Sequence, residues 1–157
     1  MTSSFFNDST AENTTYVGIG EIAIGYKDDI LKISSLGSCI GLILYPKPGS
    51  IRKKVAIMGH IMLPSSPKDD AKPTGRKWGP AKYADKAVHT MIVQLKEVGV
   101  FRENIIAKMV GGAKMFGHGS KTLQIGRNNA RETRKALSEY YVPIQRSYTG
   151  GDTGIGT

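Results

Sequence analysis

One cysteine and three histidines are the residues of this chain best suited to nucleophilic chemistry. Cys39 follows Gly37 and Ser38, two turn residues, at the start of an apolar run, and His60 follows Gly59 near the end of another. A thiol is only a few per cent ionised at neutral pH, so a catalytic cysteine needs a base. If the two runs are paired strands, the imidazole of His60 could take the Cys39 proton and return it to a leaving amine.

Purely structural roles are also open for these residues. Free cysteine is among the most buried residue types, so Cys39 in an apolar run is compatible with core packing. His60 is likewise compatible with a buried, hydrogen-bonded histidine. His118 lies between two glycines and is a rival base. His89 lies just off the apolar stripe of an expected helix, and we expect it to be structural or solvated.

Small residues near the cysteine favour a substrate site. Gly37 and Ser38 would let a substrate carbonyl and backbone N–H groups approach Cys39 closely, as an oxyanion site requires. The pair Gly111-Gly112 could bring further N–H groups to a substrate, or could form a tight turn. We therefore take Gly37, Ser38 and Gly112 as candidate substrate-binding residues.

The sequence favours catalysis without a metal or a cofactor. The cysteine and the histidines show none of the short ligand spacings of zinc sites. No Walker motif is present, and the glycines at positions 18 and 20 lack the third glycine and the helix of a dinucleotide-binding fingerprint. We expect no metal and no cofactor.

Composition places the chain among ordinary globular proteins. It has 157 residues, 39% of them hydrophobic, which suits a single domain with its own core. No apolar run approaches the roughly 18 residues that a membrane-spanning helix needs. The N-terminus lacks the pattern of a secretory signal, and a single cysteine excludes an internal disulfide, so we expect a cytoplasmic protein without membrane insertion.

The chain is basic, with 22 Lys and Arg against 13 Asp and Glu and a net charge of +9. A solvated basic surface is the simplest interpretation, and such a surface would suit an acidic protein partner. Nucleic-acid binding ranks last, because no zinc-finger spacing or aromatic-rich RNA-binding motif accompanies the charge. We expect no nucleic-acid partner.

The pattern along the chain predicts an α+β fold, with layered β-sheets and two main helices packed outside. Residues 1–13 are polar and are expected to form a flexible tail, with a single domain over 14–157. Helices are expected over 80–98 and 126–140, the second with Asn128 as its cap. Residues 65–80 should form a long loop, and the glycine-rich end, 149–157, no element unaided. Strands are expected over 15–26 (with glycines that mark a bulge or a close backbone approach), 30–33, 40–45, 55–63, 104–110, 123–125 and 142–148.

Six short motifs in order resemble the landmarks of the CheD family, the chemoreceptor glutamine deamidases of bacterial and archaeal chemotaxis. Each motif is weakly specific alone, and six in the right order are a strong signal. The motifs are Gly18-Ile19-Gly20-Glu21, Leu36-Gly37-Ser38-Cys39, Gly59-His60-Ile61-Met62-Leu63-Pro64, Lys82-Tyr83-Ala84-Asp85, Gly111-Gly112-Ala113-Lys114-Met115-Phe116 and Ile125-Gly126-Arg127-Asn128.

The resemblance implies a fold, a reaction and partners. The fold would be related to the cysteine-hydrolase domain of cytotoxic necrotizing toxins. The reaction would be that of a protein-glutamine glutaminase, which hydrolyses selected glutamine side chains of methyl-accepting chemotaxis receptors to glutamate and releases ammonia. Cys39 matches the family nucleophile and His60 the general base. The implied partners are the receptors and the phosphatase CheC, which reduces deamidase activity, and we expect a monomer.

The sequence departs from the family pattern at two places. A threonine that completes the family's catalytic triad and orients the histidine lies six residues before the cysteine, and here that position is Ile33. Ser35, which has the same strand parity, or Ser34 could supply the hydroxyl, so Ser35 is our third catalytic candidate. The family pattern also continues with another hairpin beyond the Thr149-Gly150-Gly151 turn, whereas this chain stops at Thr157.

The alternative function is a non-catalytic chemotaxis regulator that binds CheC or receptors.

Overall fold

The computed structural model describes residues 13–68, 78–114, 124–151 and 155–156. These residues form an α+β structure of sheets with two main helices, as predicted. In chain order the elements are β1 (Thr14–Tyr16), β2 (Ile22–Tyr26), β3 (Ile30–Lys32), β4 (Ser35–Leu36), β5 (Ile40–Pro46), β6 (Val55–Ile61), α2 (Ala84–Glu97), the 3₁₀ turn η2 (Arg102–Asn104), β7 (Ile105–Gly111), α3 (Ile125–Glu139), β8 (Ile144–Thr149) and β9 (Ile155–Gly156).

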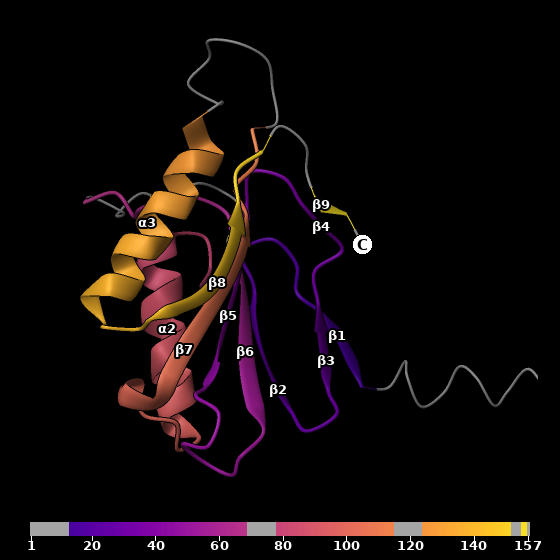
Figure 1. The fold of residues 1–157 in the computed structure, drawn as a ribbon. Coiled ribbons are helices and arrows are strands. Elements are labelled where there is room, and N and C mark those ends of the chain that lie inside the picture. The colour runs from indigo at the N-terminus through magenta and orange to yellow at the C-terminus, as the bar shows by residue number, and fades with distance from the viewer. Residues whose placement is uncertain (1–12, 69–77, 115–123, 152–154, 157) are drawn as a thin grey trace, which may run out of the picture.

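A five-stranded sheet with the order β2-β6-β5-β7-β8 organises the fold. Its first four strands are antiparallel to their neighbours, and β8 runs parallel to β7. Both helices lie on one side of this sheet, whereas the parallel pair β1–β3 lies away from them, beyond β2 (Figure 1). A third pair joins β4 to β9. The helices therefore leave one face of the sheet free for other segments of the chain.

Strand alternation divides the side chains of the two central strands between these faces. On β5, Ile40, Leu42 and Leu44 are fully buried, and on β6 Ile57 and Ile61 are fully buried too. A Cβ built at Gly59, which shares their face, would lie 2.8 Å from the Met91 sulfur of α2, so this face packs on the helices. The residues between them, which include Gly41 and His60, belong to the opposite face.

The strand predicted over residues 15–26 is two strands in different sheets, so that prediction was wrong. A tight turn separates them, in which the Glu21 carboxylate accepts the Gly18 N–H at 2.8 Å and the Glu21 N–H donates to the Gly18 carbonyl at 3.0 Å. Gly20 has a φ of +81° within this turn. Its carbonyl accepts the Ala81 N–H at 2.8 Å and would lie 2.4 Å from a Cβ built at Gly79, so Gly20 does mark a close backbone approach.

Both predicted helices exist, but their first residues differ from the prediction. The helix α2 begins at Ala84 and not at residue 80, because the residues before it pair with the end of β6: the Met62 N–H donates to Ala81 and the Leu63 N–H to Lys82. The helix α3 begins at Ile125, so Asn128 lies inside it and is not its cap, and Ile125 is not extended.

A short strand forms in the glycine-rich C-terminal end with the help of a partner. We expected no element there unaided, and β9 pairs with β4, with Leu36 opposite Ile155. The predictions for residues 1–12, most of the loop over 65–80 and part of the glycine-rich end lie outside the described residues.

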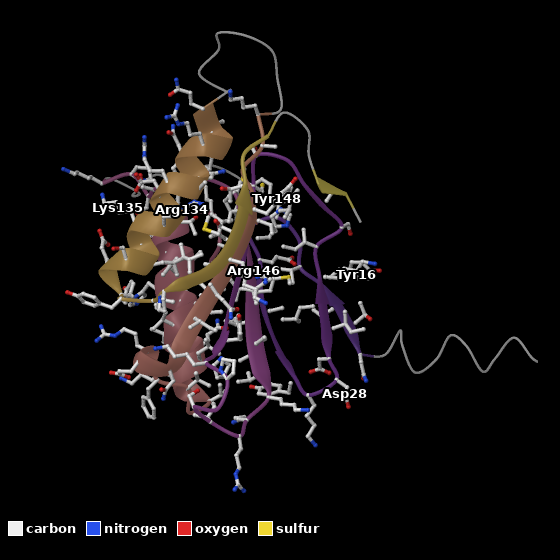
Figure 2. The ribbon with its side chains drawn as sticks, viewed as in Figure 1. Tyr16, Asp28, Arg134, Lys135, Arg146 and Tyr148 are labelled. Carbon is white, nitrogen blue, oxygen red and sulfur yellow. The ribbon has the colours of Figure 1, made fainter. Side chains whose placement is uncertain are left out.

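A charged side chain joins α3 to the edge strand of the main sheet. The Arg134 guanidinium donates to the hydroxyls of Ser147 and Thr149 on β8, each at 3.1 Å. Figure 2 shows Arg134 beside the exposed edge of β8, where Arg146 and Tyr148 lie. Within the described ranges, no helix is long and apolar enough to cross a membrane.

Candidate functional site

Cys39 and His60 lie at the same end and on the same face of the main sheet. The strands β5 and β6 are antiparallel, with Gly41 opposite His60 and Ile40 opposite Ile61 at the last pair. Cys39 directly precedes β5 and shares the parity of Gly41, which makes it a diagonal neighbour of His60. Diagonal Cα atoms are typically about 7–8 Å apart, within reach of long or ring-bearing side chains. The two strands do pair, which was the condition for the two side chains to meet, and the register places Cys39 and His60 as diagonal neighbours.

The turn after β1 holds the histidine on three sides. The His60 N–H donates to the Glu21 carbonyl at 3.0 Å, and the His60 carbonyl accepts the Gly20 N–H at 2.8 Å. The ring atom Nδ1 lies 3.1 Å from the carbonyl oxygen of Val17. His60 is only 5% exposed, so this contact is shielded from water. The turn between β1 and β2 therefore fixes both the backbone and the ring of His60.

The Val17 contact selects the tautomer of the neutral His60 ring. A backbone carbonyl can only accept a hydrogen bond, so Nδ1 must carry the hydrogen that is donated to it. In the neutral ring the other nitrogen, Nε2, then has a free lone pair. This tautomer is the one that a general base acting through Nε2 requires.

The orienting contact of the histidine differs from the one that the sequence suggested. Ser35 is exposed on β4, and its backbone pairs with Gly156 of β9. Ile33, at the position of the family threonine, packs over the sheet: its Cδ1 would lie 3.3 Å from a Cβ built at Gly41. The structure thus gives Nδ1 of His60 a main-chain acceptor, and a catalytic role for Ser35 stays a prediction.

The segment that carries Cys39 is held by a clamp of two backbone N–H groups, from Gly112 and Ala113, directly after β7. The Gly112 N–H donates to the Cys39 carbonyl at 2.9 Å, and the Ala113 N–H donates to the Gly37 carbonyl at 2.9 Å. The candidate substrate donor of Gly112 is therefore engaged with the chain itself. A substrate-binding role for Gly112 would have to come from another of its atoms, whereas Gly37 and Ser38 remain candidates, half-buried beside the thiol.

We expect Gly111→Ala to lower the free energy of unfolding by about 2–5 kcal/mol, because backbone strain and a steric clash add. Gly111 has a φ of +107°, and a Cβ there would lie 2.2 Å from the Cys39 carbonyl oxygen. Gly49→Ala is the matched control: its φ is +81°, but nothing lies within 4 Å of the new Cβ, so strain alone should cost about 1–2 kcal/mol. Urea unfolding of both variants measures the two losses of unfolding free energy. Equal losses would contradict a close packing of Gly111 against the Cys39 carbonyl.

A buried asparagine that the sequence analysis did not single out completes the site. Asn129 of α3 is fully buried, and its amide nitrogen donates to the Ser38 carbonyl at 2.9 Å and to the Met62 carbonyl at 3.0 Å. Two acceptors facing one atom identify that atom as the nitrogen. The only available signal was a polar residue on the inner face of α3, directly after the motif that ends at Asn128.

The amide oxygen of Asn129 is buried and has no hydrogen-bond partner among the described residues. A buried polar atom without a partner costs about 1–3 kcal/mol. Such a group in a native core calls for an explanation other than stability, because an apolar side chain would avoid the cost.

Partial burial raises the pKa of the Cys39 thiol above its ordinary value, because it disfavours the charged thiolate. Below its pKa the thiolate fraction, and with it the alkylation rate, rises about tenfold per pH unit. We therefore expect iodoacetamide to modify Cys39 more slowly than a free thiol near pH 7, with the inflection of the rate at a higher pH. Mass spectrometry of the quenched reaction measures this, and an inflection below that of a free thiol would contradict the expected burial effect.

The other two histidines are separate from this site or cannot be placed. His89 is exposed on α2, where its Nδ1 lies 2.7 Å from the Tyr140 hydroxyl, which confirms the structural or solvated role predicted for it. His118, the rival base, lies outside the described residues.

Comparison with known proteins gives a consistent family match. A family model described as "CheD chemotactic sensory transduction" matches residues 62–155. "Chemoreceptor glutamine deamidase CheD" of Bacillus subtilis is 38% identical over 140 residues, which cover 88% of this chain and 80% of that protein. "Probable chemoreceptor glutamine deamidase CheD" of Archaeoglobus fulgidus is 39% identical over 139 residues, 88% of this chain and 81% of that protein. The Halalkalibacterium halodurans "Chemoreceptor glutamine deamidase CheD" is 36% identical over 140 residues, 88% of this chain and 82% of that protein.

The family model begins beyond Cys39 and His60, but the pairwise matches include both. Each match leaves out only 12% of the chain. Even if all of that lay at the N-terminus, it would end before Cys39, so Cys39 and His60 both lie within the matched part. Together with the α+β fold and the paired Cys39 and His60 strands, these matches show that the chain belongs to the CheD family.

Proposed function

We propose that this protein is a cysteine-dependent glutamine deamidase that converts selected glutamine side chains of methyl-accepting chemoreceptors to glutamate. The observation that carries the proposal is the arrangement of His60, diagonal to Cys39 and with Nδ1 bonded to Val17. That arrangement supplies a nucleophile and a base with its lone pair free, which amide hydrolysis requires. The names of the relatives support the substrate class.

The first half of the reaction forms a thioester. The Cys39 sulfur attacks the side-chain amide carbon of the substrate glutamine, while Nε2 of His60 takes the thiol proton. The amide oxygen becomes an oxyanion, and backbone N–H groups near Gly37 and Ser38 are the candidates to stabilise it. His60 then gives its proton to the departing nitrogen, so that ammonia leaves and a glutamyl thioester remains on Cys39.

The second half restores the enzyme. His60 takes a proton from water as the water oxygen attacks the thioester carbon, and the proton returns to the Cys39 sulfur as the C–S bond breaks. The products are glutamate on the receptor and a regenerated thiol, with one water consumed for each ammonia released. Since burial raises the pKa of Cys39, the resting site holds a neutral thiol and depends on this base.

In this proposal the Val17 carbonyl keeps the His60 tautomer and stabilises the imidazolium that forms in each half. In the family pattern a threonine orients the histidine. Because Ile33 stands at that position here, the main-chain carbonyl of Val17 takes over the orientation of His60 in this proposal. Ser35 is retained as a candidate for the same role, which its replacement by alanine tests.

The finer predictions from the family belong to the same proposal. We propose CheC as a second partner, a monomeric state, a cytoplasmic location and a fold related to the cysteine-hydrolase domain of cytotoxic necrotizing toxins. The net charge of +9 supports docking on acidic protein surfaces. Exposed groups such as Lys135, Arg146 and Tyr148, labelled in Figure 2, are available to such a partner.

Incubation with the cytoplasmic fragment of a chemoreceptor tests the function. Each converted glutamine gains about 1 Da and releases one ammonia, both of which can be measured, because hydrolysis replaces an amide NH₂ by OH. We expect conversion at a small number of glutamines with a matching yield of ammonia. A receptor fragment that keeps all its glutamines would overturn the proposal.

A further inference from the structure

The pairing of β5 with β6 includes His60 but ends one residue short of Cys39. The last pair of the β5–β6 ladder is Ile40 opposite Ile61, so the next position along, where Cys39 would face Met62, has no ladder pair. Beyond that point backbone hydrogen bonds between the two strands no longer set the distance between the nucleophile segment and the strand of the base.

One side chain spans the two strands where the ladder ends. The amide nitrogen of Asn129 donates to the carbonyls of Ser38, directly before Cys39, and of Met62, two residues after His60. The two oxygens lie 2.9 and 3.0 Å from a single nitrogen, so its two hydrogens replace the missing cross-strand bonds.

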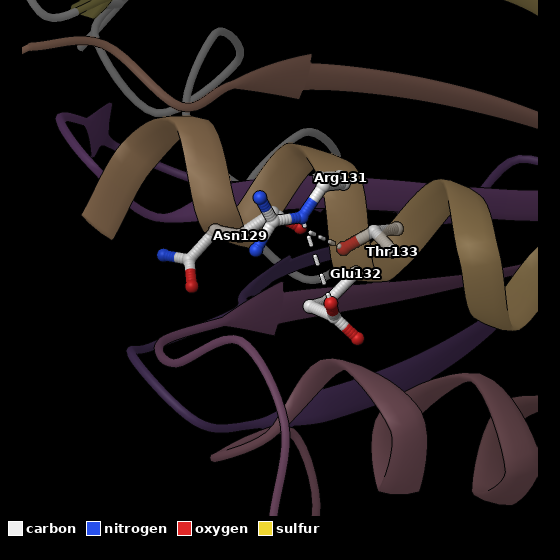
Figure 3. Close-up of polar contacts among 4 residues, drawn as sticks. All are labelled: Asn129, Arg131, Glu132 and Thr133. Atoms are coloured by element: carbon white, nitrogen blue, oxygen red, sulfur yellow. Dashed lines mark hydrogen bonds and ion pairs between the residues drawn. The ribbon is translucent and has the colours of Figure 1, made fainter. Parts of the chain in front are cut away.

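Asn129 is anchored within α3. Asn129 is fully buried, and its backbone carbonyl accepts the hydroxyl of Thr133, one turn later, at 2.7 Å. Figure 3 shows this bond within the helix, with the Asn129 side chain extending away from Thr133. The close approach of Gly126 to Gly112, whose Cβ would lie 2.8 Å from the Gly126 carbonyl, keeps the start of α3 against the clamp on Cys39.

We propose that Asn129 is a positioning residue that fixes the Cys39 segment relative to His60 by bridging the carbonyls of Ser38 and Met62. This inference rests on the proposed roles of Cys39 and His60. A misplacement of reacting groups by about 1 Å can cost roughly a hundredfold in rate. The amide oxygen, which has no hydrogen-bond partner in the described part of the chain, is consistent with a residue kept for its two donated bonds and not for stability.

The test measures how strongly His60 assists Cys39, and it needs no receptor. Alkylation of Cys39 by iodoacetamide is followed across pH 6–9 in the wild type, His60→Asn, Asn129→Ala and the double variant. We expect His60→Asn to slow alkylation about tenfold in the wild-type background and less than about twofold when Asn129 is alanine, since a lost geometry removes the coupling. With a receptor substrate, Asn129→Ala should lower kcat about 10–100-fold while KM changes much less.

Two further variants separate positioning from stability. Asn129→Asp keeps the shape but cannot donate when ionised, so it should behave like Asn129→Ala. Thr133→Val removes a buried hydrogen bond of the same helix that does not reach Cys39, so the His60 dependence should remain. If Asn129→Ala unfolds, Asn129→Ser, which still donates one hydrogen bond, gives the same comparison in a milder form.

The outcomes distinguish this inference from the proposed function. The inference is overturned if alkylation of wild-type Cys39 does not depend on His60. It is also overturned if that dependence survives in Asn129→Ala and Asn129→Asp, or if Thr133→Val loses it equally. A receptor that is never deamidated, while Asn129→Ala still abolishes the His60 dependence, would overturn the proposed function and leave the inference standing.

Discussion

Replacing His60 with asparagine is expected to lower the rate of glutamine conversion by about 10²–10⁴-fold, the usual contribution of a general base. The asparagine amide can occupy the place of Nδ1 and still donate to the Val17 carbonyl, so the fold should be little changed. What it removes is Nε2, the atom that takes the Cys39 proton. The measurement is the initial rate of receptor conversion between pH 6 and 9.

The pH profile of His60→Asn shows whether the loss of activity comes from a lost proton transfer. Because burial raises the pKa of Cys39, the thiolate fraction increases with pH throughout this range. The loss caused by His60→Asn should therefore be largest at low pH and shrink as solvent hydroxide deprotonates the thiol. A loss that stays constant with pH would contradict a proton-transfer role. Ser35→Ala is the parallel variant: unchanged activity supports the Val17 carbonyl as the orienting group, and a loss similar to that of His60→Asn supports Ser35.

Replacing Cys39 with serine is expected to reduce conversion on the order of 10³-fold or more, although only one atom changes. A serine hydroxyl has a much higher pKa than a thiol, so a histidine base alone activates it poorly. The hydrogen bonds that hold position 39 come from its carbonyl and from its neighbours, and serine keeps them. We therefore expect no loss of stability.

Two measurements on Cys39→Ser separate chemistry from folding. Thermal unfolding should give a midpoint close to that of the wild type, while the conversion rate collapses. Activity within tenfold of the wild type would indicate that residue 39 is not the attacking atom. A large fall in the unfolding midpoint would instead indicate that Cys39 is mainly a packing residue, which is the alternative role of a cysteine in an apolar run.

Local patterns predicted the strands that carry the chemistry. The apolar runs over 40–45 and 55–63 predicted β5 and β6 to within two residues, and the turn between them made their pairing as a hairpin a reasonable condition to consider. The stripe of α2 was equally clear, because its buried residues repeat every three or four positions. These features depend on residues close together in the sequence, where periodicity carries the information.

Long-range contacts were beyond the sequence patterns. The orienting group of His60 is a backbone carbonyl, Val17, which no residue type announces. The Gly111-Gly112 pair was interpreted as a turn or a donor site, but the N–H groups of Gly112 and of the next residue, Ala113, bond the carbonyls of Cys39 and Gly37, far away in the sequence. Asn129 joins Ser38 and Met62 across similar separations. Composition gave no reason to choose these partners, because register and helix placement decide them.

The parallel conversion of one receptor fragment by the wild type and by Cys39→Ala tests the central claim most directly. Peptide mapping by mass spectrometry reports each glutamine separately. We expect the wild type to convert defined glutamines to glutamate, with a gain of about 1 Da at each, while Cys39→Ala leaves all of them as amides. Equal conversion by both proteins would contradict the assignment of Cys39 as the nucleophile.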